Sequence, residues 1–165
     1  MSVEIERKFL IANDNWKNQV RGIRYRQGYI SIAPDRTVRV RTSGETAMLT
    51  IKGESNGVSR AEFEYEIPVE DANEILNTMC GAYIIEKIRY KIPYAGFVWE
   101  VDEFLGANSP LILAEIELEY EDQLFEIPDW IGDEVTGDPR YYNAYLVRNP
   151  YLTWQHSEGD YHENQ

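Results

Sequence analysis

The sequence predicts a mainly β protein of the α+β class: a closed eight-stranded antiparallel β-barrel tunnel with a charged lumen and a few helices packed outside. Three observations lead to this fold. Eight segments alternate polar and apolar residues with period 2. Short turn-forming stretches at 43–45, 53–57 and 94–96 separate several of these segments, as in hairpins. The polar faces are charged at nearly every central position.

The first two predicted strands are VEIERKFL at 3–10 and YRQGYISI at 25–32. The polar face of the first carries two carboxylates and an ammonium: Glu4, Glu6 and Lys8. The second alternates more weakly, and its polar positions are Gln27, Tyr29 and Ser31. For the first strand alone, a solvated edge of a sheet is the simpler explanation of the pattern, and the rest of the chain has to decide.

The middle of the chain contains three predicted strands, at 37–43, 47–54 and 60–67. Their charged positions are Arg39, Arg41, Lys52, Arg60, Glu62, Glu64 and Glu66. Three more strands are predicted at 86–92, 98–104 and 113–120. Their charged positions are Lys87, Arg89, Lys91, Glu100, Asp102, Glu115, Glu117 and Glu119. Strands this close in sequence pair as antiparallel neighbours.

Helical signals are fewer. Residues 70–80 have acidic residues in the first turn, spaced apolar residues and a following glycine, which predicts a helix. Short helices are predicted near 14–20, 129–135 and 143–149. No linker or repeat divides the chain, so we expect one domain over residues 1–154 and a polar, disordered tail over 155–165.

The charged residues of the strand faces are not a random sample of the chain. The acids on one face are Glu4, Glu6, Glu62, Glu64, Glu100, Asp102, Glu115 and Glu117. The bases are Lys8, Arg39, Arg41, Lys52, Arg60, Lys87 and Arg89. This face therefore holds seven of the 16 basic residues but only eight of the 29 acidic ones. Solvation by chance does not predict that segregation, whereas closure into a barrel with these faces inward does.

Composition excludes several classes of function. The formal net charge of −13 argues against nucleic-acid binding and against anionic membranes. The single cysteine, Cys80, excludes an intramolecular disulfide and a cysteine-built zinc site. The only histidines, His156 and His162, lie in the polar tail. No stretch resembles a signal sequence or membrane span, so we expect a cytoplasmic protein.

A lumen lined by both acids and bases suits one class of ligand, a polyphosphate chelated by a divalent metal. Arginine and lysine side chains bind phosphate oxygens, and carboxylates hold the cation that neutralises them. Because only carboxylate oxygen is available as a ligand, the expected metal is Mg²⁺ or Mn²⁺.

These segments resemble the CYTH superfamily, the triphosphate tunnel metalloenzymes. The E-x-E-x-K of residues 4–8 resembles the signature of that family. The other matching blocks follow in the usual order: YRQGYI, TVRVR, LTIKG, RAEFEYEIP, Lys87-x-Arg89, Glu100-x-Asp102 and Glu115-x-Glu117. The stretch VTGDPRYYNAYL, residues 135–146, is similar to the C-terminal block of bacterial members. The compact form with the QGYI block most resembles the inorganic triphosphatases.

The resemblance implies an eight-stranded tunnel that binds a triphosphate end-on with divalent cations. It implies one metal site built from Glu4, Glu6, Glu115 and Glu117. It implies that a second metal, or its water, is held by Glu62, Glu64, Glu100 and Asp102. The implied phosphate contacts are Lys8, Arg39, Arg41, Lys52, Arg60, Lys87 and Arg89. The alternative for each of these residues is a structural ion pair within the lumen.

The expected reaction is metal-dependent hydrolysis that releases the terminal phosphate of inorganic triphosphate, mainly through positioning and charge neutralisation. Tyr29, assisted by the ammonium of Lys87, is a candidate general base. A metal-bound water activated by a carboxylate explains hydrolysis equally well. Other activities of the fold stay open: a class IV-type adenylate cyclase, a thiamine or nucleoside triphosphatase, or a non-catalytic polyphosphate-binding module. The oligomeric state, including a homodimer, is also left open.

Overall fold

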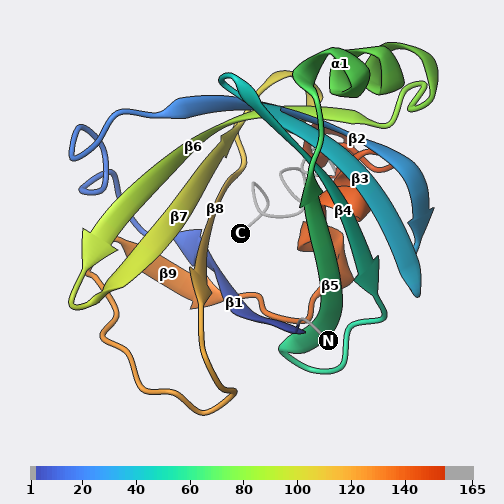
Figure 1. The fold of residues 1–165 in the computed structure, drawn as a ribbon. Helices are drawn as coiled ribbons and strands as arrows, with labels where there is room; N and C mark the ends of the chain where they lie inside the picture. Colours follow the sequence, from blue (N-terminus) through green and yellow to red (C-terminus); the bar gives the residue numbers. More distant parts are fainter. Residues whose placement is uncertain (1–2, 155–165) are drawn as a thin grey trace.

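The computed structural model describes residues 3–154. The strands in this range form one continuous sheet that closes into a barrel (Figure 1). The strands are β1 (Val3–Ile11), β2 (Ile23–Ala33), β3 (Arg36–Ser43), β4 (Thr46–Gly53), β5 (Ser59–Glu66), β6 (Ile84–Tyr94), β7 (Phe97–Phe104), β8 (Ile112–Glu117) and β9 (Ile131–Glu134). The helices are α1 (Val69–Thr78) and α2 (Asn143–Leu146), with 3₁₀ turns η1 (Gly106–Asn108) and η2 (Pro139–Tyr141).

The barrel has the order β5-β4-β3-β2-β6-β7-β8-β1, and pairing between β5 and β1 closes it. Every pairing is antiparallel, so the prediction of a closed eight-stranded antiparallel barrel is confirmed. Two-residue loops join β3 to β4 and β6 to β7. In the second loop Ala95 and Gly96 both have positive φ, as the tight turn of a twisted hairpin requires.

The ninth strand was not predicted. Only Val3–Ile5 of β1 pair with β5, which leaves the rest of that edge of β1 without a partner in the barrel. β9 pairs there instead, with Phe9 opposite Glu134 and Ile11 opposite Ile131. The predicted helix at 129–135 is therefore wrong, because the open strand edge binds this segment as a strand and buries Ile131.

The other predicted helices had mixed outcomes. Helix α1 confirms the prediction at 70–80, and α2 confirms a shorter form of the one at 143–149. The helix predicted at 14–20 is wrong, because the segment forms turns. Asn18 has φ of 65°, which is outside the helical region, and Trp16 is buried against Tyr90 of β6.

Apolar side chains pack on the outside of the barrel wall. Helix α1 places Ala72 and Leu76 against Val40 of β3 and Ala47 of β4. Gly28 of β2 permits this close packing, because a Cβ atom there would lie only 2.8 Å from Leu76. An aromatic cluster around Trp99 covers another side, and the segment from Tyr141 to Leu146 packs against Ile85 and Phe104. The lumen is thus left to the polar faces of the strands.

Within residues 3–154, no helix is long and apolar enough to cross a membrane. The single domain over 1–154 stays a prediction. The predicted disordered tail, 155–165, lies outside the described residues.

Candidate active site

The barrel encloses a cavity of about 910 Å³ whose wall is made largely of charged side chains. Fifteen of the sixteen sequence-predicted site residues line it, and Asp102 is the exception. Lys8 is only 7% exposed, although a lysine on a solvated edge strand would be in water. The edge-strand alternative for residues 3–10 is therefore wrong, and this polar face points into the tunnel.

One sector of the wall is acidic because two neighbouring strands bring their glutamates into register. Glu6 of β1 lies opposite Glu117 of β8, and Lys8 lies opposite Glu115. Side chains directly opposite on one sheet face are close neighbours. Glu4, one step along the same face of β1, completes the group.

Burial and the charges of neighbouring carboxylates raise the pKa of two glutamates of this sector and of nearby Glu62. Burial, together with the charges of Glu115 and Glu4, raises the pKa of Glu6 well above its ordinary value. Burial and Glu4 raise the pKa of Glu62 to about 7. Burial and Glu4 also raise the pKa of Glu117. A divalent cation would relieve this repulsion, so the donor set fits Mg²⁺ or Mn²⁺.

The carboxylates are gathered but do not form a finished cage. Among residues 3–154, no three metal-ligating side chains already converge as a bound cation requires. One reason is that Glu4 is paired with Lys52 at 2.9 Å, and this base lowers the pKa of Glu4 despite its burial. The same ammonium lies 3.6 Å from Glu62. A cation would therefore displace a lysine from this sector as it bound.

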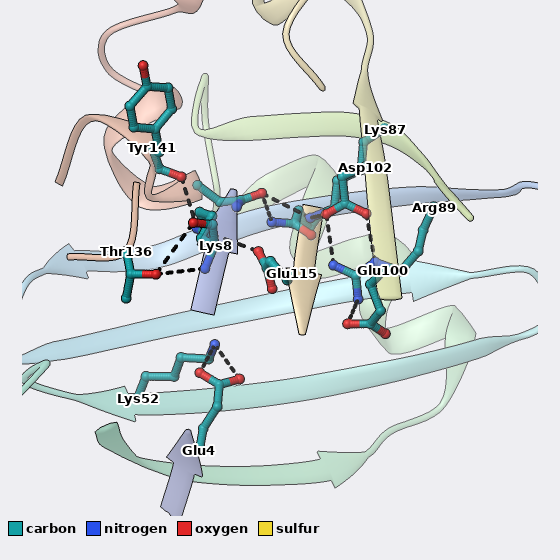
Figure 2. Close-up of polar contacts among 12 residues, drawn as sticks. Glu4, Lys8, Lys52, Lys87, Arg89, Glu100, Asp102, Glu115, Thr136 and Tyr141 are labelled. Atoms are coloured by element: carbon teal, nitrogen blue, oxygen red, sulfur yellow. Dashed lines mark hydrogen bonds and ion pairs between the residues drawn. The ribbon is translucent and has the colours of Figure 1, made fainter. Parts of the chain in front are cut away.

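Asp102 is the centre of a separate buried group, apart from the Glu4–Lys52 pair (Figure 2). Arg89 donates to both of its oxygens at 2.7 and 2.8 Å, and Lys87 lies 2.8 Å from Oδ2. These two bases hold the pKa of Asp102 well below its usual range despite burial. Asp102 thus supports two cavity-lining bases from behind, where sequence reasoning expected it to face a metal. Glu100 does line the cavity, and it contacts Arg89 at 3.3 Å.

Tyr29 and Lys87 belong to one hydrogen-bond chain that passes through two amides. Gln27 donates to Tyr29 Oη at 3.3 Å and to Asn143 Oδ1 at 3.0 Å. Lys87 donates to the same Oδ1 at 3.0 Å. Burial lowers the pKa of Lys87 to about 7, although Asp102 opposes the shift.

The segment after β9 supplies contacts that sequence reasoning missed. Lys8 donates through Nζ to the carbonyl of Tyr141 at 3.0 Å, and its ammonium lies 3.5 Å from Glu115 (Figure 2). The backbone N–H of Lys8 donates to Thr136 at 2.9 Å. Asn143 comes from the same segment. The sequence signal for these contacts was the block at 135–146, which resembles the C-terminal block of bacterial members. That resemblance did not assign a role to any single residue of the block.

The remaining bases lie on β3 and β5. Arg39 donates to Thr50 at 3.2 Å and lies 3.6 Å from Glu64. Arg60 donates to the carbonyl of Gly53 at 2.9 Å. Arg41 projects over the ring of Tyr25, with Cζ 4.9 Å from the ring centre. The cavity therefore presents carboxylates and anion-binding groups to one enclosed volume, which can hold a metal-chelated polyanion.

Comparison with known proteins agrees with this geometry. The CYTH domain matches residues 2–142. A protein of Acetivibrio thermocellus named inorganic triphosphatase is 56% identical over 155 residues, which are 94% of this chain and 99% of the relative. A protein of Nitrosomonas europaea with the same name is 40% identical over 149 residues, or 87% of this chain and 96% of the relative.

Structural comparison gives the same grouping. A crystal structure of an inorganic triphosphatase superposes with a TM-score of 0.64 at 36% sequence identity. The match covers 89% of this chain and 95% of that protein. The charged tunnel, the extent of the domain match and these relatives agree: the chain belongs to the CYTH family.

Proposed function

We propose that this protein is an inorganic triphosphatase that hydrolyses the terminal phosphoanhydride bond in a divalent-cation-dependent reaction. The observation that carries the proposal is the barrel cavity, in which a crowded glutamate sector faces the same volume as the seven predicted basic side chains. Inorganic triphosphate is the substrate that the names of the two relatives specify, and it has no group that needs a nucleoside pocket.

The basic side chains bind the polyanion. Arg39, Arg41 and Arg60 approach from β3 and β5, and Lys8, Lys87 and Arg89 from β1 and β6. In the free protein most of these bases are held by carboxylates or carbonyls, which keeps them ordered in a partly dry cavity. Phosphate oxygens would replace those acceptors, so the bases are already largely desolvated when substrate enters.

Glu4, Glu6, Glu115 and Glu117 would hold a divalent cation, Mg²⁺ or Mn²⁺. We place a second site at Glu62, Glu64 and Glu100, and exclude Asp102 because it does not line the cavity and its oxygens are held by Arg89 and Lys87. The cation, when bound, neutralises charge on the phosphate oxygens and on the leaving group. The glutamates orient it with respect to the bases on the facing strands.

The chemical step is attack of water on the terminal phosphorus. An O–P bond forms, the bond to the bridging oxygen breaks, and pyrophosphate leaves. Lys87 has a pKa of about 7 and so can exchange a proton near neutral pH. With Tyr29, to which Gln27 and Asn143 connect it, it is our candidate for holding the proton that water loses.

A phosphate-release panel tests this function. The substrates are inorganic triphosphate, ATP, thiamine triphosphate and pyrophosphate, each with Mg²⁺, with Mn²⁺ and with a chelator. We expect inorganic triphosphate with metal to be turned over fastest and pyrophosphate to be a poor substrate, because two phosphates engage fewer bases. Faster turnover of ATP with a cyclic product would identify a cyclase. Tight binding without turnover would identify a binding module.

A further inference from the structure

Arg41 differs from the other six of the seven basic residues that we expect to contact phosphate. Each of the others donates to a carboxylate, a carbonyl or a hydroxyl: Lys8, Arg39, Lys52, Arg60, Lys87 and Arg89. Across the described part of the chain, the guanidinium of Arg41 makes no hydrogen bond and no ion pair, and its contact is with the ring of Tyr25. Its donors are therefore available to a phosphate without displacement of an acid.

An isolated guanidinium in this cavity is costly. Burial and the charges of Arg39 and Arg89 lower the pKa of Arg41 to about 10. The residue still carries its charge at neutral pH, but with no carboxylate to fix the position of a long side chain. An unheld arginine would lose conformational freedom when it bound a phosphate, which weakens binding.

Tyr25 is in contact with two arginines. The Cζ atoms of Arg41 and Arg89 each lie 4.9 Å from its ring centre. The tyrosine is 5% exposed and lines the cavity. A guanidinium over an aromatic face within about 6 Å is attracted by the ring, and the attraction is larger where water is excluded.

The strand register explains this arrangement. β2 lies between β3 and β6 in the barrel. Tyr25 pairs with Ser43 on one side and Lys87 on the other, so Arg41 and Arg89 are its diagonal neighbours, two residues along each flanking strand. The ring thus lies beside both guanidiniums, which come from the two flanking strands. Arg89 is fixed by Asp102, so the ring has one rigid neighbour and one otherwise unheld neighbour.

We propose that Tyr25 is a positioning residue that holds the guanidinium of Arg41 ready for a phosphate of the substrate. The inference rests on the proposed triphosphatase function. The face of the Tyr25 ring makes the contact with the Arg41 guanidinium, and the hydroxyl is not needed for it. Arg89 is held by Asp102 without the ring, so Tyr25 acts on substrate binding through Arg41, and its loss should weaken binding and leave the chemical step intact.

The test combines steady-state kinetics with thermal unfolding of the free protein, for Tyr25→Leu, Tyr25→Phe, Arg41→Ala and the double variant Tyr25→Leu/Arg41→Ala. With inorganic triphosphate at saturating Mg²⁺, we expect Tyr25→Leu to raise KM about tenfold and to change kcat by less than about twofold. Tyr25→Phe keeps the ring and should stay within about twofold of the wild type. In the Arg41→Ala background, Tyr25→Leu should change KM by less than about twofold.

A matched control is Tyr90→Leu. Tyr90 is on β6 and packs its ring against Trp16, 5.1 Å away, outside the cavity. This variant should lower Tm and leave KM unchanged, which separates loss of packing from loss of positioning. If Tyr25→Leu does not fold, a ring-fluorinated phenylalanine at position 25 keeps the shape of Tyr25→Phe but weakens attraction to cations, and should reproduce the rise in KM.

The proposal is overturned if Tyr25→Leu leaves KM unchanged, if it raises KM equally with and without Arg41, or if Tyr25→Phe is as defective as Tyr25→Leu. Thermal unfolding of the free protein measures the contact between Tyr25 and Arg41 in the absence of substrate. Tyr25→Leu should lower Tm less in the Arg41→Ala background than in the wild type. A wild type that does not hydrolyse triphosphate would defeat the proposed function, whereas equal Tm losses in both backgrounds would defeat the positioning of Arg41.

Discussion

The ammonium of Lys52 on β4 donates hydrogen bonds to both carboxylate oxygens of Glu4 on β1, at 2.9 and 3.1 Å. A candidate phosphate-binding base and a candidate metal ligand therefore neutralise each other in the free protein. Both side chains are largely buried. Bound triphosphate would bind Lys52 and so free Glu4 for the cation. A bound cation would bind Glu4 and so free Lys52 for triphosphate. Binding of metal and of triphosphate should be mutually reinforcing.

Because Glu4 is paired with Lys52, Glu4→Gln should change both metal binding and triphosphate binding. The variant lacks a charged oxygen ligand, so the metal concentration for half-maximal rate should rise by at least about tenfold. Without metal, the variant should bind triphosphate more tightly than the wild type, because Lys52 no longer has a carboxylate to leave. Metal titration of the rate and calorimetric titration with triphosphate in a chelator measure the two effects. Weaker metal-free binding by Glu4→Gln would show that Lys52 does not contact the substrate.

Asp102 should be a determinant of stability. Asp102→Asn leaves Lys87 buried without its ion-pair partner and Arg89 with Glu100 alone, and we expect about 3–5 kcal/mol of destabilisation in denaturant unfolding. The matched control is Glu134→Gln, which removes the partner of Arg7 where both side chains are about one-third exposed. That loss should be about 1 kcal/mol or less. Equal losses for the two variants would mean that burial of the Asp102 group has no energetic consequence.

The stability of the metal-free protein should depend on Glu62. Its pKa is about 7 in the folded state against an ordinary value of 4.5, so the folded state binds more protons between these values. The stability that the protonated group contributes is complete below about pH 4.5 and is lost as pH rises towards about 7. Between about pH 5 and about pH 7.5, the Tm of the wild type should therefore fall relative to Glu62→Gln. A difference in Tm that stays constant over this range would contradict the raised pKa.

The alternation of charged and apolar residues was enough to predict the barrel and the direction of its polar faces. A period of 2 places Glu4, Glu6 and Lys8 on one face of the strand. If this charged face points into the barrel, the apolar face must point outward, where the few helices cover it. The strand β9 could not be predicted in this way. Its formation depends on the edge of β1 left open beyond Ile5, which is a property of the closed barrel.

The site was predicted less completely than the fold. Asp102 shares the face of Glu100 in sequence, but only the packing of Arg89 and Lys87 over it shows that it lies behind the cavity wall. The contacts of Asn143 and of the Tyr141 carbonyl come from a segment more than a hundred residues from Lys8 and Gln27. Local patterns carry no information on such distant hydrogen bonds.

Lys8 pairs with Glu115 of the acidic sector and is a proposed phosphate contact. Lys8→Met removes the ion-pair partner of Glu115 and, on our proposal, a phosphate contact. We expect kcat/KM to fall at least tenfold, about 1.4 kcal/mol of transition-state stabilisation. Lys17→Met is the control, because Lys17 is exposed, lies outside the cavity and contacts Asp14 and the ring of Trp16. Triphosphate with Mg²⁺ should raise the Tm of Lys17→Met as much as that of the wild type, and that of Lys8→Met much less. Wild-type kinetics for Lys8→Met would remove this residue from the site.

The most direct test is a product analysis by phosphorus NMR during the reaction of the wild type with inorganic triphosphate. With Mg²⁺ or Mn²⁺, we expect one orthophosphate and one pyrophosphate for each triphosphate consumed, with pyrophosphate accumulating because it engages fewer of the seven bases. With a chelator, we expect no turnover. Consumption of triphosphate that persists in the chelator, or its complete stability in the presence of both metals, would contradict a metal-dependent triphosphatase in this tunnel.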